Sequence, residues 1–267
     1  MPTVTSKDGT KIAFDKVGSG PAVILVNGAI AYRAFDDGTM AQLAKLLGEH
    51  FTVYNYDRRG RGESGNTLPF TKQREIEDLQ ALVEDAGEAM VLGFSSGSAV
   101  TLDTTAVTPG ITKVAVYEAP FIVDDSRQPV PTDYAEQLMK FSIEGKHEEA
   151  VEYFARYALG IPDEYIGGMK QDQATWSGMT GVGHTIAYDA AFVGSVMQGK
   201  PLPTNRWSNV TVPVLVLDGG ASDAFMGNAA NALAKVLPNA RRQTLEGQTH
   251  SVDPKVLAPV IIEFFKK

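Results

Sequence analysis

The ten residues from Val91 to Val100 read VLGFSSGSAV, and their pattern changes abruptly in the middle. The apolar run up to Phe94 is typical of a buried strand, and the small residues from Ser96 onward predict a helix. Ser95 is therefore expected on a tight turn between strand and helix, which forces its backbone into strained dihedral angles. The residues two positions away on either side must be small, because side chains there would collide, and both are glycines. The alternative is a glycine-rich turn whose serine only caps a helix.

Short apolar runs of the same kind recur along the chain, and amphipathic stretches separate them. A run that is apolar on every side suits a strand that is buried on both faces of a parallel sheet. The alternation predicts an α/β fold, in which helices cover both faces of a mostly parallel sheet. Thr10–Asp15 alternates and follows a Lys-Asp-Gly turn, which predicts a hairpin near the start. The expected strands are Ala22–Val26, Phe51–Tyr56, Met90–Phe94, Val114–Tyr117, Val214–Leu217 and Arg241–Leu245, and the expected helices are Met40–Leu47, Glu75–Ala86, Ser96–Val107, Asn228–Leu237 and Val256–Lys266.

One long segment interrupts this alternation. Between Phe121 and Trp207 no apolar strand run occurs, and amphipathic stretches such as DYAEQLMKFSIEG and HEEAVEYFARYALG predict helices. Loops that contain prolines flank the segment. We therefore predict a core made of residues 1–120 and 208–267, with residues 121–207 inserted as a helical cap over the carboxyl edge of the sheet.

Composition and charge exclude several kinds of partner. The 267 residues carry a formal net charge of −8, which argues against nucleic acid and anionic membranes, since both favour a basic surface. The arginine-glycine run Arg58–Gly62 is therefore better explained as a loop after a strand than as an RNA-binding segment. The chain has no cysteine, no motif with metal-ligand spacing and no dinucleotide fingerprint, so neither a metal nor a cofactor is expected. No secretory or membrane-spanning stretch is found, so we expect a cytoplasmic protein, as a monomer or a homodimer.

Four stretches resemble motifs of the α/β-hydrolase family, and together they span nearly the whole chain. They are VILVNGA (residues 23–29), YDRRGRGES (56–64), LGFSSGSA (92–99) and LEGQTHSVDP (245–254). The resemblance implies a mostly parallel eight-stranded sheet with an inserted helical cap, and a site made of a nucleophile, a histidine and an acid. The chain departs from the family pattern at Asn27, where histidine is usual. The resemblance specifies no substrate.

Ser95 is the candidate nucleophile and His250 the candidate base. A serine hydroxyl needs an adjacent base to attack a carbonyl group near neutral pH. His250 is one of four histidines, and it lies between the last expected strand and the last expected helix. The alternative for His250 is a surface loop histidine.

The acid has three candidates. The family usually takes it from the loop after the VPVLVLDGG stretch, where Asp223 stands one residue later than the usual position. Glu118 directly follows a buried strand and is the favoured choice, because some family members, including fungal zearalenone lactonases, use a glutamate at that strand end. Their Ser-Ser-Gly turn is similar to Ser95–Gly97. Asp218 is the third candidate, since a role as a turn or capping residue also explains it.

The remaining site predictions concern binding. Backbone N–H groups need no particular side chain, so the expected oxyanion hole survives the departure at Asn27. Packing inside the cap explains the aromatic residues of the cap as well as contacts with a substrate do. The expected oxyanion donors are Ala29 and Ser96, and the candidate substrate contacts are Ile30, Trp176, His184 and Tyr188.

Three functions are compatible with the sequence. The first is hydrolysis of an apolar carboxylic ester or lactone through an acyl-enzyme on Ser95. The second is different chemistry at the same site, because the Gly-Phe-Ser turn also resembles cofactor-free haloperoxidases (perhydrolases) and because polyketide-tailoring members of the fold exist. The third is a binding protein without catalysis, which the substitution at Asn27 and the uncertain acid mildly favour.

Overall fold

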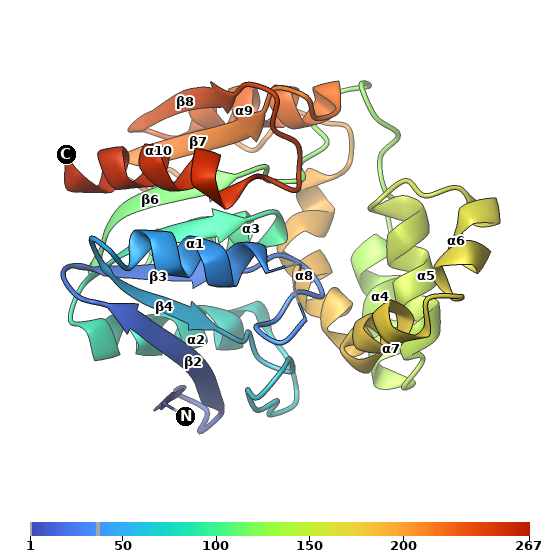
Figure 1. Ribbon diagram of the computed structural model, residues 1–267. Coiled ribbons are helices and arrows are strands. Elements are labelled where there is room, and N and C mark those ends of the chain that lie inside the picture. Colours follow the sequence, from blue (N-terminus) through green and yellow to red (C-terminus); the bar gives the residue numbers. More distant parts are fainter. Residues whose placement is uncertain (1, 36–37) are drawn as a thin grey trace.

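An eight-stranded sheet forms the centre of the molecule in the computed structural model, which describes residues 2–35 and 38–267 (Figure 1). Its order is β1-β2-β4-β3-β5-β6-β7-β8. β2 is antiparallel to both of its neighbours, whereas all the other pairs are parallel, as expected. The predicted hairpin is confirmed in β1 and β2. The strands are β1 (Thr3–Thr5), β2 (Lys11–Gly18), β3 (Ala22–Val26), β4 (Thr52–Tyr56), β5 (Ala89–Phe94), β6 (Ile111–Tyr117), β7 (Val214–Gly219) and β8 (Ala240–Leu245).

Helices cover both faces of this sheet (Figure 1). Alternate residues of β3 enter opposite hydrophobic cores: Val23 and Leu25 pack on the side of α1 and α10, whereas Ile24 and Val26 pack on the side of α2 and α3. This two-sided burial explains why β3 is apolar throughout. The helices are α1 (Thr39–Leu47), α2 (Lys72–Ala86), α3 (Ser96–Thr105), α4 (Tyr134–Ile143), α5 (His147–Tyr157), α6 (Asp163–Met169), α7 (Gln173–Gly181), α8 (Ile186–Val193), α9 (Ala224–Val236) and α10 (Pro254–Lys266), with short 3₁₀ turns at Gly183–Thr185 and Gly194–Val196.

The segment between β6 and β7 is helical, as its amphipathic pattern predicts. It contains α4 to α8 and no strand, and the structure describes all of its residues. Figure 1 shows α4, α5, α6 and α7 as a group beyond the carboxyl ends of the parallel strands. α8 leaves this group and packs against α3 of the core. The insertion therefore contacts the core at the same edge of the sheet where Ser95 lies.

α2 and α9 begin three or four residues earlier than the sequence pattern predicts. α2 starts at Lys72 and not at Glu75, because its first turn is polar and shows no apolar period. α9 starts at Ala224 and not at Asn228, and it runs through Gly227, a residue that weakens a helical pattern. Among the described residues, no helix combines the length and the apolar character that crossing a lipid bilayer requires.

Candidate active site

Strained backbone marks the carboxyl edge of the sheet. Ile30, Ser95 and Glu118 follow β3, β5 and β6, which are neighbours in the sheet, and have φ angles of 57°, 50° and 47°. In the described part of the chain, no other residue except glycine has a positive φ. L-residues disfavour this left-handed region, and such strain persists only where the surrounding structure enforces it. The strain predicted at Ser95 is therefore present, and two further strand ends share it.

The turn at Ser95 has room only for glycine two positions away on either side. A Cβ atom on Gly93 would lie 2.6 Å from the Thr101 hydroxyl oxygen, and one on Gly97 would collide with the carbonyl oxygen of Asn27. Real Cβ atoms do not approach other atoms so closely. The collision argument made for these two positions is confirmed.

Glu118 and His250 form a hydrogen-bonded pair. One carboxylate oxygen of Glu118 lies 2.7 Å from Nδ1 of His250, and the other accepts a 2.9 Å hydrogen bond from the Gly219 N–H. The Glu118 side chain is fully buried, whereas that of His250 is 50% exposed. Burial alone would raise the pKa of Glu118, but the hydrogen bonds from His250 and Gly219 outweigh it and hold this pKa below its ordinary value.

The two other candidate acids do not contact His250. Asp218 forms an ion pair with Arg242, at distances of 2.6 and 2.8 Å, and also accepts from the Thr244 hydroxyl. Asp223 immediately precedes α9 and lines the cavity described below, but in the described part of the chain it makes no hydrogen bond to His250. The geometry therefore favours Glu118 over both aspartates.

Hydrogen bonds to the backbone hold the loop that carries His250. The Tyr117 hydroxyl donates to the Thr249 carbonyl at 2.6 Å, and the Ala221 N–H donates to the Gln248 carbonyl at 2.8 Å. Tyr117 is the last residue of β6 and directly precedes Glu118. One strand end thus fixes both the acid and the loop that brings the histidine to it.

A cavity of about 370 Å³ lies between this edge of the sheet and the insertion. Ser95, Glu118, His250 and both predicted oxyanion donors, Ala29 and Ser96, line it. A second cavity of about 380 Å³ adjoins the first and shares Ser95 and His250 with it. Ser95 therefore lies at the junction of the two cavities. This arrangement has room for a substrate whose reacting group carries one substituent in each cavity.

The candidate substrate contacts divide between these cavities and the interior of the cap. Ile30 lines the second cavity, whereas Trp176, His184 and Tyr188 line neither, so the prediction for these three is corrected. Tyr188 stacks on Phe70 with ring centroids 3.8 Å apart. Trp176 is buried in the core cluster, and His184 packs beside the ring of His147. Their side chains are used in packing the cap onto the core.

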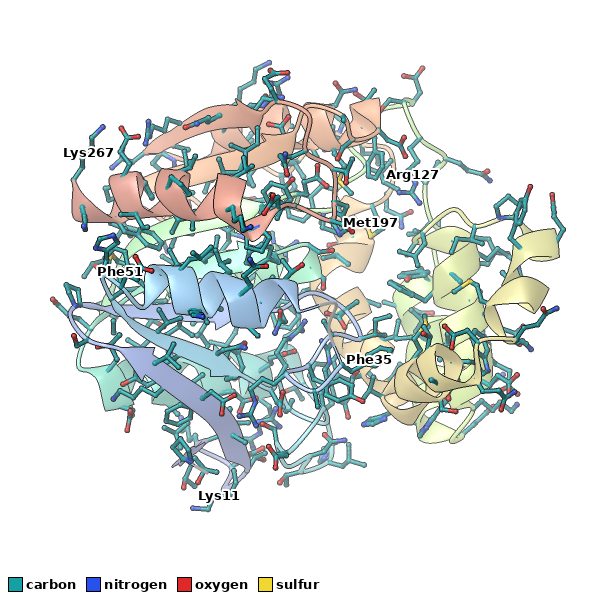
Figure 2. All side chains as sticks on the ribbon, in the orientation of Figure 1. Lys11, Phe35, Phe51, Arg127, Met197 and Lys267 are labelled. Carbon is teal, nitrogen blue, oxygen red and sulfur yellow. The ribbon has the colours of Figure 1, made fainter. Side chains whose placement is uncertain are left out.

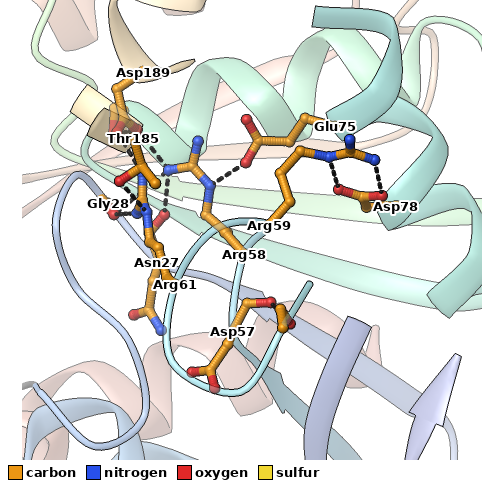
Figure 3. Close-up of polar contacts among 12 residues, drawn as sticks. Asn27, Gly28, Asp57, Arg58, Arg59, Arg61, Glu75, Asp78, Thr185 and Asp189 are labelled. Carbon is orange, nitrogen blue, oxygen red and sulfur yellow. Dashed lines mark hydrogen bonds and ion pairs between the residues drawn. The ribbon is translucent and has the colours of Figure 1, made fainter. Parts of the chain in front are cut away.

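Buried arginines of the loop after β4 form a cluster of ion pairs (Figure 3). Arg58 pairs with Glu75 and Asp189, and Arg59 pairs with Asp78. Arg61 pairs with the same Asp189, which comes from α8 of the insertion. All three arginines are at most 1% exposed, so this arginine-glycine run is internal structure and presents no basic surface. The YDRRGRGES motif was the available sequence signal for this cluster, but it did not reveal the partners.

The same cluster contacts both predicted oxyanion donors. The Ser96 hydroxyl donates to Asp189 at 2.7 Å. Arg61 donates at 2.6 Å to the carbonyl of Gly28, which belongs to the same peptide group as the N–H of Ala29. A hydrogen bond on one side of a planar peptide group fixes the direction of the N–H on the other. The arginine cluster therefore orients Ala29 and ties Ser96 to the insertion.

Comparisons with known proteins agree with this architecture. The model of the Alpha/beta hydrolase family matches residues 23–260. An alpha/beta hydrolase from Sphaerobacter thermophilus DSM 20745 is 48% identical, with a TM-score of 0.87, and the match covers 99% of this chain and 100% of that one. The enol-lactonase of Burkholderia xenovorans LB400 superposes with a TM-score of 0.70 at 19% identity over the full length of both chains.

A sequence relative also matches nearly full length. A Mycobacterium tuberculosis protein named as a candidate non-heme bromoperoxidase is 26% identical over an alignment of 269 positions, which covers 95% of this chain and 97% of the relative. At 19% identity the enol-lactonase shows the fold alone, whereas the family model covers most of the chain. The chain belongs to the alpha/beta hydrolase family.

Proposed function

We propose that this member of the family is a serine hydrolase that cleaves a carboxylic ester or lactone through an acyl-enzyme on Ser95. The observation that carries the proposal is the 2.7 Å contact between Glu118 and Nδ1 of His250, beside the cavity that Ser95 lines. A buried carboxylate on one ring nitrogen fixes the imidazole tautomer, so that the other nitrogen can accept the serine proton. The esterase and lactonase folds among the structural neighbours agree with this chemistry.

The reaction follows from these roles. The Ser95 oxygen attacks the carbonyl carbon while His250 takes the hydroxyl proton, and Glu118 stabilises the imidazolium that forms. The N–H groups of Ala29 and Ser96 bind the negative oxygen of the tetrahedral intermediate. His250 then gives its proton to the leaving alkoxide, and an acyl-enzyme remains. Water attacks this ester with His250 again as base, and the carboxylic acid is released.

Replacing Ser95 tests the proposal. Ser95→Ala should lower ester turnover by about 10³-fold or more, because it deletes the nucleophile. A fluorophosphonate probe should label the wild type on the peptide that contains Ser95 and should leave Ser95→Ala unlabelled. Ser98→Ala is the matched control, since Ser98 is a buried serine of the adjacent helix α3 whose hydroxyl donates to the Gly93 carbonyl. Turnover by Ser95→Ala within a few-fold of wild type would overturn the assignment.

Peroxide-dependent halogenation is a second candidate activity, supported by the relative named as a candidate bromoperoxidase. A perhydrolase would use the same serine, so the Ser95→Ala test does not separate it from an esterase. Bromination of an organic acceptor in the presence of hydrogen peroxide, acetate and bromide would identify it. A protein that is neither labelled nor active in either assay would instead be a binding protein on this scaffold.

A further inference from the structure

The largely apolar wall of the 370 Å³ cavity contains a guanidinium group that forms no ion pair with a carboxylate of the described residues. Arg127, in the loop between β6 and α4, lines this cavity together with Met197 (Figure 2). Its side chain is half-buried and donates at 2.5 Å to the carbonyl of Ala158, at the end of α5. Its guanidinium lies 4.5 Å from the ring centroid of Phe225. Among the described residues, no carboxylate forms an ion pair with it.

This position is unfavourable for a guanidinium without a partner. Burial lowers the pKa of Arg127 from its ordinary value, and the charge of Asp223 opposes that effect only in part. The two other carboxylates that line the cavity are already engaged: Glu118 with His250 and Gly219, and Asp189 with the arginine cluster. A partly desolvated cation gains most from a counter-charge supplied by a ligand.

A second hydrogen-bond donor lines the same cavity as Arg127. It is Tyr134, the buried first residue of α4. In the described part of the chain its hydroxyl makes no hydrogen bond. Apart from Asp189, the other residues of the insertion and of α9 that line the cavity are apolar, and they include Phe154, Leu159, Val193, Met197 and Phe225.

We propose that the ester cleaved at Ser95 carries a carboxylate at the end of an apolar chain, and that Arg127 and Tyr134 bind this carboxylate. The inference rests on the proposed function and adds a substrate class to it. Among the described residues the guanidinium donates only through Nη2, to the Ala158 carbonyl, so its remaining N–H groups are available for charge-assisted hydrogen bonds to a carboxylate. The apolar wall suits the methylene chain that links the carboxylate to the ester.

Pairs of chromogenic esters test this class directly. We would measure kcat and KM for 4-nitrophenyl monoesters of adipic and suberic acid, and for the matched esters in which a primary amide replaces the free carboxylate. The wild type should prefer the carboxylate by about tenfold or more in kcat/KM for at least one chain length, because charge-assisted hydrogen bonds are the strong ones. The preference should lie mainly in KM, since the carboxylate is remote from the reacting carbonyl.

Charge variants should move this ratio in opposite directions. Arg127→Gln should abolish the preference, and Arg127→Lys should keep part of it. Asp223→Asn should increase the preference, because it removes the competing negative charge near Arg127. Arg156→Gln is the matched control and should leave the ratio unchanged, since Arg156 pairs with exposed Asp163 on the cap.

The outcomes separate this inference from the proposed function. A wild-type ratio near one for both chain lengths, or a preference that survives Arg127→Gln, would overturn the carboxylate site while Ser95-dependent hydrolysis of the amide esters stands. Failure to hydrolyse either member of a pair, together with no fluorophosphonate labelling of Ser95, would overturn the proposed function itself. If Arg127→Gln fails to fold, the ratios of Arg127→Lys and Asp223→Asn decide, and no change in either would reject the inference.

Discussion

The Glu118 carboxylate is held in a fixed position. It directly follows β6, its backbone is held with φ at 47°, and both of its carboxylate oxygens accept hydrogen bonds. A carboxylate fixed in this way can orient an imidazole without moving during the reaction. Asp223 has none of these restraints on its side chain in the described structure. Glu118 is therefore better suited than Asp223 to the role of the acid, because hydrogen bonds already hold its carboxylate oxygens.

Neutralising each acid in turn should separate them. Glu118→Gln should reduce kcat by about 10³- to 10⁴-fold, because the amide no longer favours the productive tautomer of His250. Asp223→Asn should remain within a few-fold of wild type on a neutral ester. Steady-state kinetics with 4-nitrophenyl butyrate would measure both, and circular dichroism would verify that Glu118→Gln is folded. The reverse result would assign the acid to the loop after β7.

At the scale of the elements, α3 and α8 are joined through one side-chain contact that reaches the candidate oxyanion hole. Ser96, the first residue of α3, donates to Asp189 of α8, and Asp189 is held by two buried arginines. An element of the insertion thereby helps to fix the residue whose N–H is expected to bind the oxyanion. This coupling predicts that removal of the Ser96 hydroxyl changes the rate, although that hydroxyl takes no part in the proposed reaction.

Removing that hydroxyl should lower the rate as well as the stability. Ser96→Ala should reduce kcat by about tenfold, the cost of a less well fixed donor, and should destabilise the fold by about 1 kcal/mol through one lost buried hydrogen bond. Ser98→Ala removes a similar bond, to the Gly93 carbonyl, and should lower stability without lowering kcat. Urea unfolding combined with kinetics would measure both. Equal effects on kcat would show that the contact has no special role.

The pattern of elements could be predicted from the sequence, but the interior of the cap could not. Apolar runs located β3 to β7 within a few residues, because burial on both faces demands them. In the insertion, however, an apolar residue can face the cavity or the packing between helices, and periodicity does not distinguish the two. The pattern therefore does not decide between packing and substrate contact for Trp176 and Tyr188, and it gives no signal for Arg127, a loop arginine in a proline-containing stretch.

At the scale of the whole molecule, the protonation of His184 makes the stability of the fold depend on pH. It lies between the cap and the loop after β4, close to His147 and Gly60. Burial, together with the charges of His147 and Arg61, lowers its pKa to about 4. An unfolded chain takes up a proton on this histidine below about pH 6.5, whereas the folded protein does so only near pH 4. The unfolded state therefore binds more protons in this window, and stability falls as the pH falls.

Removing His184 should flatten this dependence. Between pH 6.5 and 4, His184→Gln should lose about 1 to 3 kcal/mol less unfolding free energy than the wild type. Urea midpoints measured across this range would give the difference. His50→Gln, which alters an exposed histidine outside the cap, should follow the wild-type curve. A parallel course of the His184→Gln and wild-type curves would contradict the assignment of the acid sensitivity to His184.

The left-handed backbone at Ile30, Ser95 and Glu118 has a consequence for the evolution of heat tolerance. A glycine at any of these strand ends would relieve the conformational penalty, so selection for a higher melting temperature alone would favour it. At two of the three positions the same exchange would delete the proposed nucleophile or the proposed acid. Selection for heat tolerance can therefore remove this penalty at Ile30 but not at Ser95 or Glu118, and the part of the sheet edge that carries these two residues should be the part of the fold that gains least.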